Sequence, residues 1–446
     1  METVTPIEKQ KIAARYLWLG VTALGIAGMF ALILVIGRTP QLAAFGVMQQ
    51  LFSVALVVHV DLSVLIWFLC VGGMGWSMLS QQFGCAPRYW QRTGWGVMAA
   101  ATALIALSPL SQPWEVLKSN YIPVLNNLPF LAGLGLLAAG LLIVLLPLLK
   151  LLRLTAAKQC DNTALYFLSA GVVTLLSIIA FALSARYLPN GLSTEERFNT
   201  LFWAGGHILQ FSFSLLMMAG WVALAEAISG RALARSVALL GCAILLIASL
   251  LSLAGFAQNS FSSAAFGDYQ TRVMIEWGGV APLLLTVVIL SKHLRGIVRA
   301  NRAYVSALLA SLVVFGAGGG IGLMIAGQNV VIPAHYHGEI VGVTLALMGL
   351  AYTMLPRFGY QSVAGTRLAF WQPIVYGIGQ LMHVGGLAYS GGYGVLRKTA
   401  GGFANMAPDV KIALGVMGAG GTFAIVGGLL FVIVMLRSGA QRGKSE

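Results

Sequence analysis

Long apolar runs dominate this sequence and constrain its fold more than any other feature. A run of about 18 or more residues with few charges is long enough to cross a bilayer as one helix. Twelve such runs follow one another, and the short connections between them leave no room for a soluble domain. They predict helices near residues 13–37, 50–80, 94–110, 129–153, 164–185, 200–228, 232–256, 274–291, 303–326, 331–355, 369–390 and 410–436.

The composition points to the same fold class. Of the 446 residues, 58% are hydrophobic and only 9% are charged, whereas a globular domain carries roughly a quarter charged residues. We therefore expect an all-α polytopic membrane protein with a single transmembrane domain over residues 1–446. The run near residues 13–37 is longer than a signal-peptide core and has no small-residue cleavage site behind it, so we interpret it as a retained first helix.

The net charge of +14 is explained by membrane topology and does not require nucleic acid as a partner. Most of the 27 Lys and Arg residues lie in the terminal segments and in alternate loops, which face the same side of the membrane. Cytoplasmic loops carry an excess of these residues. We therefore expect a multi-pass protein of the inner, cytoplasmic membrane with both termini in the cytoplasm.

The cysteines exclude two classes of metal site. The chain has four of them, and they form neither a CxxC nor a CxxCH motif. This pattern argues against covalent haem attachment and against a zinc or iron–sulfur site.

Five of the six histidines fall at one depth in the bilayer. In the predicted topology, these five lie roughly 6–13 Å below the outer surface of the hydrocarbon core. An ionisable side chain inside a membrane helix is costly and by default marks a functional site. The alternative for each is a hydrogen bond to a neighbouring hydroxyl or carbonyl. The sixth histidine, His293, lies in a basic cytoplasmic loop and is interpreted as an interfacial residue. The five are His59, His207, His335, His337 and His383.

The stretch AHYHGEIVG places His335 and His337 two residues apart on one predicted helix. Residues with this spacing are about 200° apart around an α-helix, so the two side chains face opposite sides and cannot share one metal ion. They can serve two different groups that flank the helix. Neutral imidazole is a common axial ligand of haem iron, so two non-covalent haems fit this geometry. A zinc site needs convergent ligands, which this spacing does not provide.

The histidines lie in motifs that resemble a known family. The helix near 200–228 carries FWAGGH (202–207), and the helix near 331–355 carries His335-Tyr336-His337, with LPRFG following at 355–359. The helix near 369–390 carries QLMHVGGLA (380–388), which is followed by Arg397-Lys398. With His59 in the second helix, this set resembles subunit I of the haem–copper oxidase and nitric oxide reductase superfamily, such as cytochrome c oxidase subunit I, over essentially the whole chain.

The resemblance implies a role for four histidines. His59 and His337 would ligate a low-spin haem from its two faces, and His335 would be the axial ligand of a second haem. His207 matches one of three histidines that hold a distal copper in the family. In this chain it would lie on the distal side of the second haem, as a ligand or as a packed side chain. The haems would be b-type and bound without covalent bonds.

Charged residues accompany these histidines. Arg397 and Lys398 match cations that neutralise haem propionates in the family, and the alternative is that they are ordinary loop cations. Asp61 and Glu339 would tune the haems or form hydrogen bonds to nearby polar groups. The inner halves of the seventh and eighth helices lack Lys, Asp and Glu, so the sequence offers no proton route from the cytoplasm.

The sequence departs from the family at the distal metal site. The oxygen-reducing members carry two adjacent histidines in the seventh helix, but LLIASLLSLAGFAQNSFSS (245–263) contains none. Phe211 stands where the oxidases have a tyrosine. A single imidazole does not hold copper in a stable site, so we expect no copper.

Two glycine-rich runs, GAGGGIG (316–322) and GAGGT (418–422), fall inside predicted helices. Small residues let helices approach closely. We interpret both runs as packing surfaces, because no strand precedes them as a phosphate loop requires.

Three functions remain open. The first is a haem-binding membrane subunit that carries electrons within a larger respiratory complex, with a periplasmic cytochrome or another electron-donor subunit as partner. The second is a divergent terminal oxidase or nitric oxide reductase with a rebuilt distal site near Gln258 and Asn259. The third, from another class, is a twelve-helix transporter or a haem-handling protein.

Overall fold

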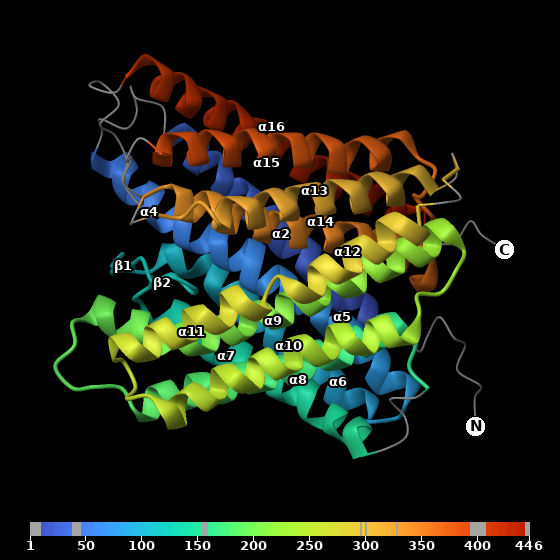
Figure 1. The fold of residues 1–446 in the computed structure, drawn as a ribbon, viewed down its shortest axis with the longest axis horizontal. Coiled ribbons are helices and arrows are strands. Elements are labelled where there is room, and N and C mark those ends of the chain that lie inside the picture. Colours follow the sequence, from blue (N-terminus) through green and yellow to red (C-terminus); the bar gives the residue numbers. More distant parts are fainter. Residues whose placement is uncertain are drawn as a thin grey trace. The chain divides into compact units, whose positions relative to one another are not determined.

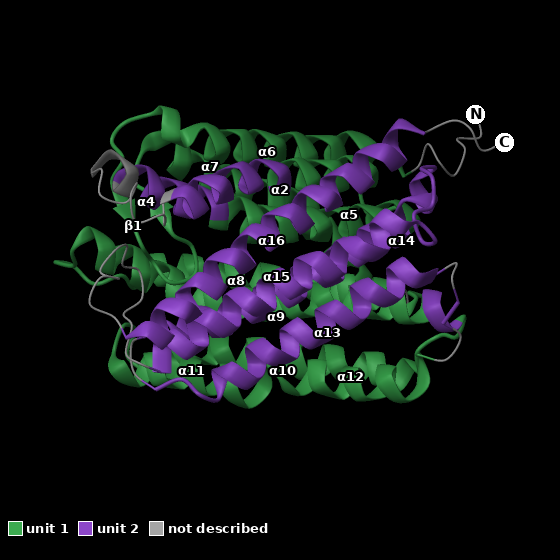
Figure 2. Cartoon of the chain, turned by 90° about the horizontal axis from the view of Figure 1, so that it is seen from above, with its two compact units in different colours: residues 1–23, 60–226, 230–294 green, residues 24–59, 227–229, 295–446 purple. Residues whose placement is uncertain are grey.

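The chain folds into two compact units, which are coloured separately in Figure 2. The computed structural model describes residues 10–37, 46–153, 159–294, 297–298, 301–326, 329–392 and 407–441. Unit 1 comprises residues 1–23, 60–226 and 230–294, and unit 2 comprises residues 24–59, 227–229 and 295–446. Figure 1 labels the elements of both.

Helices build nearly all of unit 1. Its elements are the first part of α2 (Lys11–Gly37), the π-helix η1 (Asp61–Ile66), α5 (Trp67–Gln82), α6 (Arg88–Leu107), the 3-10 helix η2 (Ser108–Leu110), the strands β1 (Val116–Leu117) and β2 (Val124–Leu125), α7 (Leu128–Leu145), the 3-10 helix η3 (Leu146–Arg153), α8 (Asn162–Arg186), most of α9 (Thr194–Ser229), α10 (Arg235–Gln258), α11 (Ala264–Trp277) and α12 (Val280–Lys292).

Unit 2 contains the remaining helices. They are the second part of α2, nearly all of α4 (Gly46–Val60), α13 (Arg302–Gly322), α14 (Val331–Met354), the 3-10 helix η6 (Pro356–Phe358), α15 (Arg367–Gly392) and α16 (Pro408–Ala440).

The fold class expected from the sequence is confirmed. In the described part of the chain, ten helical spans are long and apolar enough to cross a membrane. Helices α14 and α15 have the length of a span but are not among these ten. They are the helices that carry His335, His337 and His383, whose polar side chains interrupt the apolar pattern. The protein is therefore an all-α polytopic membrane protein.

Local capping explains where several helices begin. Ser193 closes a capping box with Glu196, so α9 starts at Thr194, before the apolar run near 200–228. The single helix expected near 274–291 is instead the end of α11 followed by α12, with a break at residues 278–279. The span starts at Ala264, where the Ser263 side chain accepts a hydrogen bond from the Phe266 N–H. A polar cap residue can therefore start a helix ahead of its apolar stretch.

Close glycine contacts hold the helices of unit 2 together. A Cβ added at Gly318 of α13 would lie 2.7 Å from the carbonyl carbon of Gly338 on α14. A Cβ at Gly420 of α16 would lie 2.5 Å from the carbonyl oxygen of Gly379 on α15. Both glycine-rich runs therefore serve close packing of helices, as small residues do in membrane proteins.

A short hairpin in unit 1 connects α6 to α7. Its two strands pair antiparallel, with Val116 opposite Leu125 and Leu117 opposite Val124. The backbone N–H of Asn120 donates to Oδ1 of Asn199 in α9 over 3.2 Å. The hairpin turn is therefore tied to the first turns of α9, the helix that carries His207.

Candidate functional site

The five histidines expected in the membrane share one hydrogen-bond geometry. In each, Nδ1 lies 2.8–3.1 Å from a backbone carbonyl oxygen. A carbonyl only accepts, so Nδ1 carries the proton and the lone pair of the neutral ring is on Nε2. The histidine and carbonyl pairs are His59 with Ala27, His207 with Trp203, His335 with Gly318, His337 with Pro333 and His383 with Met417.

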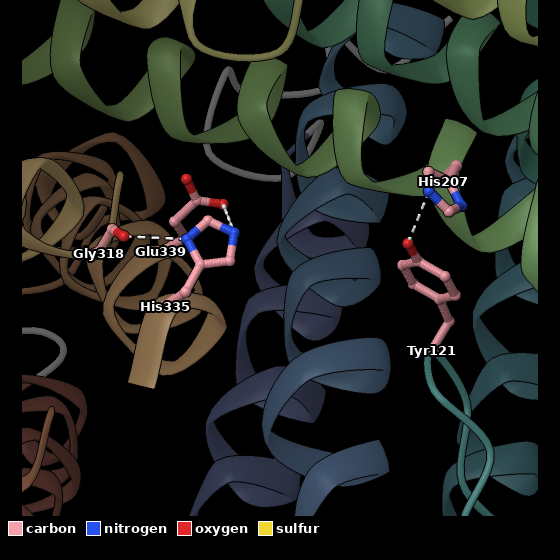
Figure 3. A network of polar contacts seen from close by, with 5 residues as sticks. All are labelled: Tyr121, His207, Gly318, His335 and Glu339. Atoms are coloured by element: carbon pink, nitrogen blue, oxygen red, sulfur yellow. Dashed lines mark hydrogen bonds and ion pairs between the residues drawn. The ribbon is translucent and has the colours of Figure 1, made fainter. Parts of the chain in front are cut away.

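His335 faces α13. Its Nδ1 donates to the Gly318 oxygen over 2.9 Å, and a Cβ added at Gly322 would lie 2.6 Å from the same nitrogen. One turn further along α14, the Glu339 carboxylate lies 3.8 Å from Nε2 of His335. Figure 3 shows the contacts of His335 with Gly318 and Glu339. A group bound to Nε2 would therefore lie close to a carboxylate.

His337 faces a different neighbour from His335, as their spacing predicts. Its ring lies 5.4 Å from that of His383 on α15, centroid to centroid, and 5.5 Å from that of Tyr336. His383 is held in turn by α16, through the hydrogen bond to Met417. Glycine at position 420 lets α16 approach α15 closely at this point, since a Cβ there would lie 2.5 Å from the backbone nitrogen of His383.

His59 lies directly before the π-helix η1, in the span that α4, η1 and α5 form together. Its Nδ1 donates to the Ala27 oxygen of α2, so two helices of unit 2 fix this ring. Asp61 opens the π-helix and is only 1% exposed. Among the described residues, neither of its carboxylate oxygens has a hydrogen-bond partner. Buried polar atoms without partners are rare and require an explanation, and π-helices often occur at functional sites.

Both ring nitrogens of His207 form a hydrogen bond. Nδ1 donates to the Trp203 oxygen over 2.9 Å, and Nε2 accepts the Tyr121 hydroxyl over 3.0 Å. Figure 3 shows the phenol directed at the imidazole. Burial raises the pKa of Tyr121 above its ordinary value, which keeps the phenol protonated as a donor.

Sequence reasoning did not find Tyr121. It lies 86 residues before His207, in a loop without a recognised motif, so no spacing rule connects the two.

The remaining residues predicted for the site add little to its geometry. Arg397 and Lys398 lie outside the described residues, so their proposed contacts with propionates stay predictions. Gln258 is exposed at the end of α10, and Asn259 follows it.

The donor set suits haem iron better than an all-protein metal site. Within the described part of the chain, no three His, Cys, Asp or Glu side chains are grouped to hold a metal ion. An axial ligand of haem needs only one imidazole nitrogen for each face of the iron, with the other nitrogen fixed by a second partner. The geometry at His59, His335 and His337 meets this requirement.

Taken together, the long helices and the imidazoles oriented by backbone carbonyls define a polytopic membrane protein whose candidate site is a set of single histidines on separate helices. Sequence comparison gives the family. The family described as "Cytochrome C and Quinol oxidase polypeptide I" matches residues 11–430, and the chain belongs to it. It is thus a subunit I-like membrane protein, as the motifs predicted.

Two relatives have no described activity. The uncharacterized protein RP382 of Rickettsia prowazekii (strain Madrid E) is 30% identical, and the match covers 97% of each chain. An uncharacterized protein of Aquifex aeolicus (strain VF5) is 27% identical, over 78% of this chain and 86% of its own.

Proposed function

We propose that this protein is a haem-binding membrane subunit that carries electrons within a larger respiratory complex, without a copper site for oxygen reduction. The observation that supports this most is the shared orientation of the histidines. In the proposed ligands His59, His335 and His337, a carbonyl holds the proton on Nδ1 and leaves the lone pair on Nε2, the form in which imidazole ligates iron. Membership of the oxidase family supports haem as the bound group.

His59 and His337 are the proposed ligands of a low-spin haem. Both lie in unit 2, and both rings are oriented by hydrogen bonds to the backbone. With one imidazole on each face, the iron would have no open coordination position, which suits electron transfer. The haem would supply a reversible one-electron change, and the helices would exclude water from it.

His335 is the proposed ligand of a second haem on the other side of α14. Gly318 fixes the ring, and the Glu339 carboxylate lies beside the ligating nitrogen. In its ionised form, Glu339 would lower the reduction potential of this haem, because a negative charge close to an iron stabilises the oxidised form. Arg397 and Lys398 are proposed to neutralise haem propionates.

The place of the protein in the cell follows from the same proposal. The excess of Lys and Arg in alternate loops supports an inner-membrane protein with both termini in the cytoplasm. The histidines then lie near the outer surface, so a periplasmic cytochrome or another electron-donor subunit is the proposed partner.

Optical and paramagnetic-resonance spectra of the purified protein test the proposal. We expect a Soret band and a low-spin ferric signal in the wild type. His59→Ala and His337→Ala should each remove the low-spin signal. His335→Ala should keep that signal and change the spectrum of the second haem instead.

His293→Ala is the matched control, because this histidine is the C-cap residue of α12 and follows the last residue of the span Ala264–Lys292. The sequence predicted an interfacial residue there, but its side chain is buried at the helix end. The variant should leave both haem signals unchanged. A wild-type protein without a Soret band would refute the haem proposal. Normal spectra in all three ligand variants would refute the assignment of ligands.

A further inference from the structure

We infer that Tyr121 prevents His207 from binding a metal ion. A hydrogen-bonded tyrosine–histidine pair then occupies the position at which the oxidase resemblance implies a copper ligand. The inference deepens the proposed function, on which it rests, by explaining why a chain of this family works without copper.

The first support is the occupancy of both imidazole nitrogens. A metal bonds to imidazole through a lone pair. In His207 the Nδ1 proton goes to the Trp203 carbonyl, and the Nε2 lone pair accepts the Tyr121 hydroxyl over 3.0 Å. Copper would therefore have to displace one of these partners. His207 is only 3% exposed, so water cannot easily replace a lost partner.

The second support is the space made for the phenol. A Cβ added at Gly206 would overlap the ring of Tyr121, and one added at Gly205 would overlap the ring of Phe181. The two glycines of the FWAGGH segment thus let two aromatic side chains pack directly against the backbone of α9. Gly206 makes room for Tyr121, a residue of the hairpin between β1 and β2.

The third support is the cluster of rings around the pair. Tyr121 lies 4.8 Å from His207 and 5.8 Å from Trp203, centroid to centroid, and Trp203 lies 5.0 Å from His207. The contact between Asn120 and Asn199 holds the hairpin beside this cluster. Several contacts therefore fix the phenol in place, in addition to its single hydrogen bond.

The helix that supplies the other copper ligands in the family cannot compensate. Helix α10 contains no histidine, and its buried Ser252 is hydrogen-bonded to Gln270 of α11. A single imidazole with a tyrosine on its lone pair is a poor copper site.

Nitrogen-15 NMR of histidine-labelled protein tests the pair directly. The reduced, carbon monoxide-saturated form is used, so that any ferrous haem present is diamagnetic. The His207 resonances are identified by their loss in His207→Gln. We expect a protonated Nδ1 and an unprotonated Nε2 whose resonance is shifted upfield by the hydrogen bond. In Tyr121→Phe, and in Gly206→Ala where Tyr121 is displaced, the Nε2 resonance should move downfield.

Two control variants keep the test specific. Tyr187→Phe removes a different, exposed hydroxyl, and Gly267→Ala adds a methyl group where nothing lies within 4 Å. Neither should move the His207 resonances. Metal analysis of the wild type grown with copper should find copper far below one ion per chain.

Two results would overturn the inference. One is an Nε2 resonance of His207 that does not respond to Tyr121→Phe. The other is stoichiometric copper in the wild type that disappears in His207→Gln. Neither readout depends on haem, so failure of this inference is distinguishable from failure of the proposed function.

Discussion

At the scale of single residues, backbone carbonyl groups determine the orientation of the histidine rings and which ring nitrogen carries the proton. Carbonyl oxygens orient His59, His335, His337 and His383 through Nδ1, and in His207 a phenol also takes the second nitrogen. His59, His335 and His337 are thereby proposed haem ligands, whereas Nε2 of His207 is a hydrogen-bond acceptor. The difference comes from neighbours that are distant in the sequence.

His383 provides a prediction at this scale. Its ring contacts that of His337 at a centroid distance of 5.4 Å, so we expect it to fix the plane of the proposed haem ligand. His383→Leu should retain the low-spin haem but shift its g-values and its midpoint potential, because the ring of His337 gains rotational freedom. Electron paramagnetic resonance and a redox titration measure both quantities.

The control for this prediction is His293→Leu, which should change neither quantity. Loss of the low-spin haem in His383→Leu would instead make His383 a ligand. Unchanged g-values and potential would show that the ring contact has no influence on the iron.

The sequence identifies which histidines are candidates, but it does not predict the contacts around them. Hydrophobicity and topology place five histidines at one depth, and the two-residue spacing of His335 and His337 predicts that they face different neighbours. The roles of Tyr121, Gly206 and Met417 depend on contacts between separate elements. A hydrogen bond across 86 residues leaves no local pattern in the chain.

At the scale of elements, the apolar runs predict the helices well and their ends less well. Caps at Ser193 and Ser263 start α9 and α11 in polar sequence, ahead of the hydrophobic stretch. The hairpin of β1 and β2 is too short to show an alternating pattern. Glycines then determine how closely two helices approach, and at Gly318 this contact also holds His335.

Substitution of Gly318 tests this contact between α13 and α14. Gly318→Val should lower the free energy of unfolding by about 1–3 kcal/mol, the usual effect of overpacking. The reason is that a Cβ at this position would lie 2.5 Å from the backbone nitrogen of Glu339. The displaced helix should also weaken the hydrogen bond to His335 and reduce occupancy of the second haem. Thermal unfolding in detergent and the optical spectrum report these changes.

Gly320→Val is a matched control, since it adds the same side chain two residues away, where nothing lies within 4 Å of the added Cβ. It should be close to the wild type in stability and spectrum. Equal unfolding temperatures for the two variants would contradict the role assigned to Gly318.

At the scale of the whole molecule, the distribution of charge sets the expected orientation in the membrane. Because Lys and Arg concentrate in alternate loops, we expect both termini in the cytoplasm and the Tyr121 hairpin in the periplasm. Reporter fusions should show a cytoplasmic signal at residue 446 and a periplasmic signal after residue 120. The reverse pattern would place the histidines near the inner surface and remove the reason for a periplasmic partner.

The central claim is that imidazoles of this chain bind haem, with α14 between two porphyrins. The pyridine haemochrome assay on purified protein of known concentration tests it most directly. The account predicts b-type haem at close to two per chain, which acidified acetone extracts because no covalent bond holds it. A purified, folded protein that contains no haem would contradict the account.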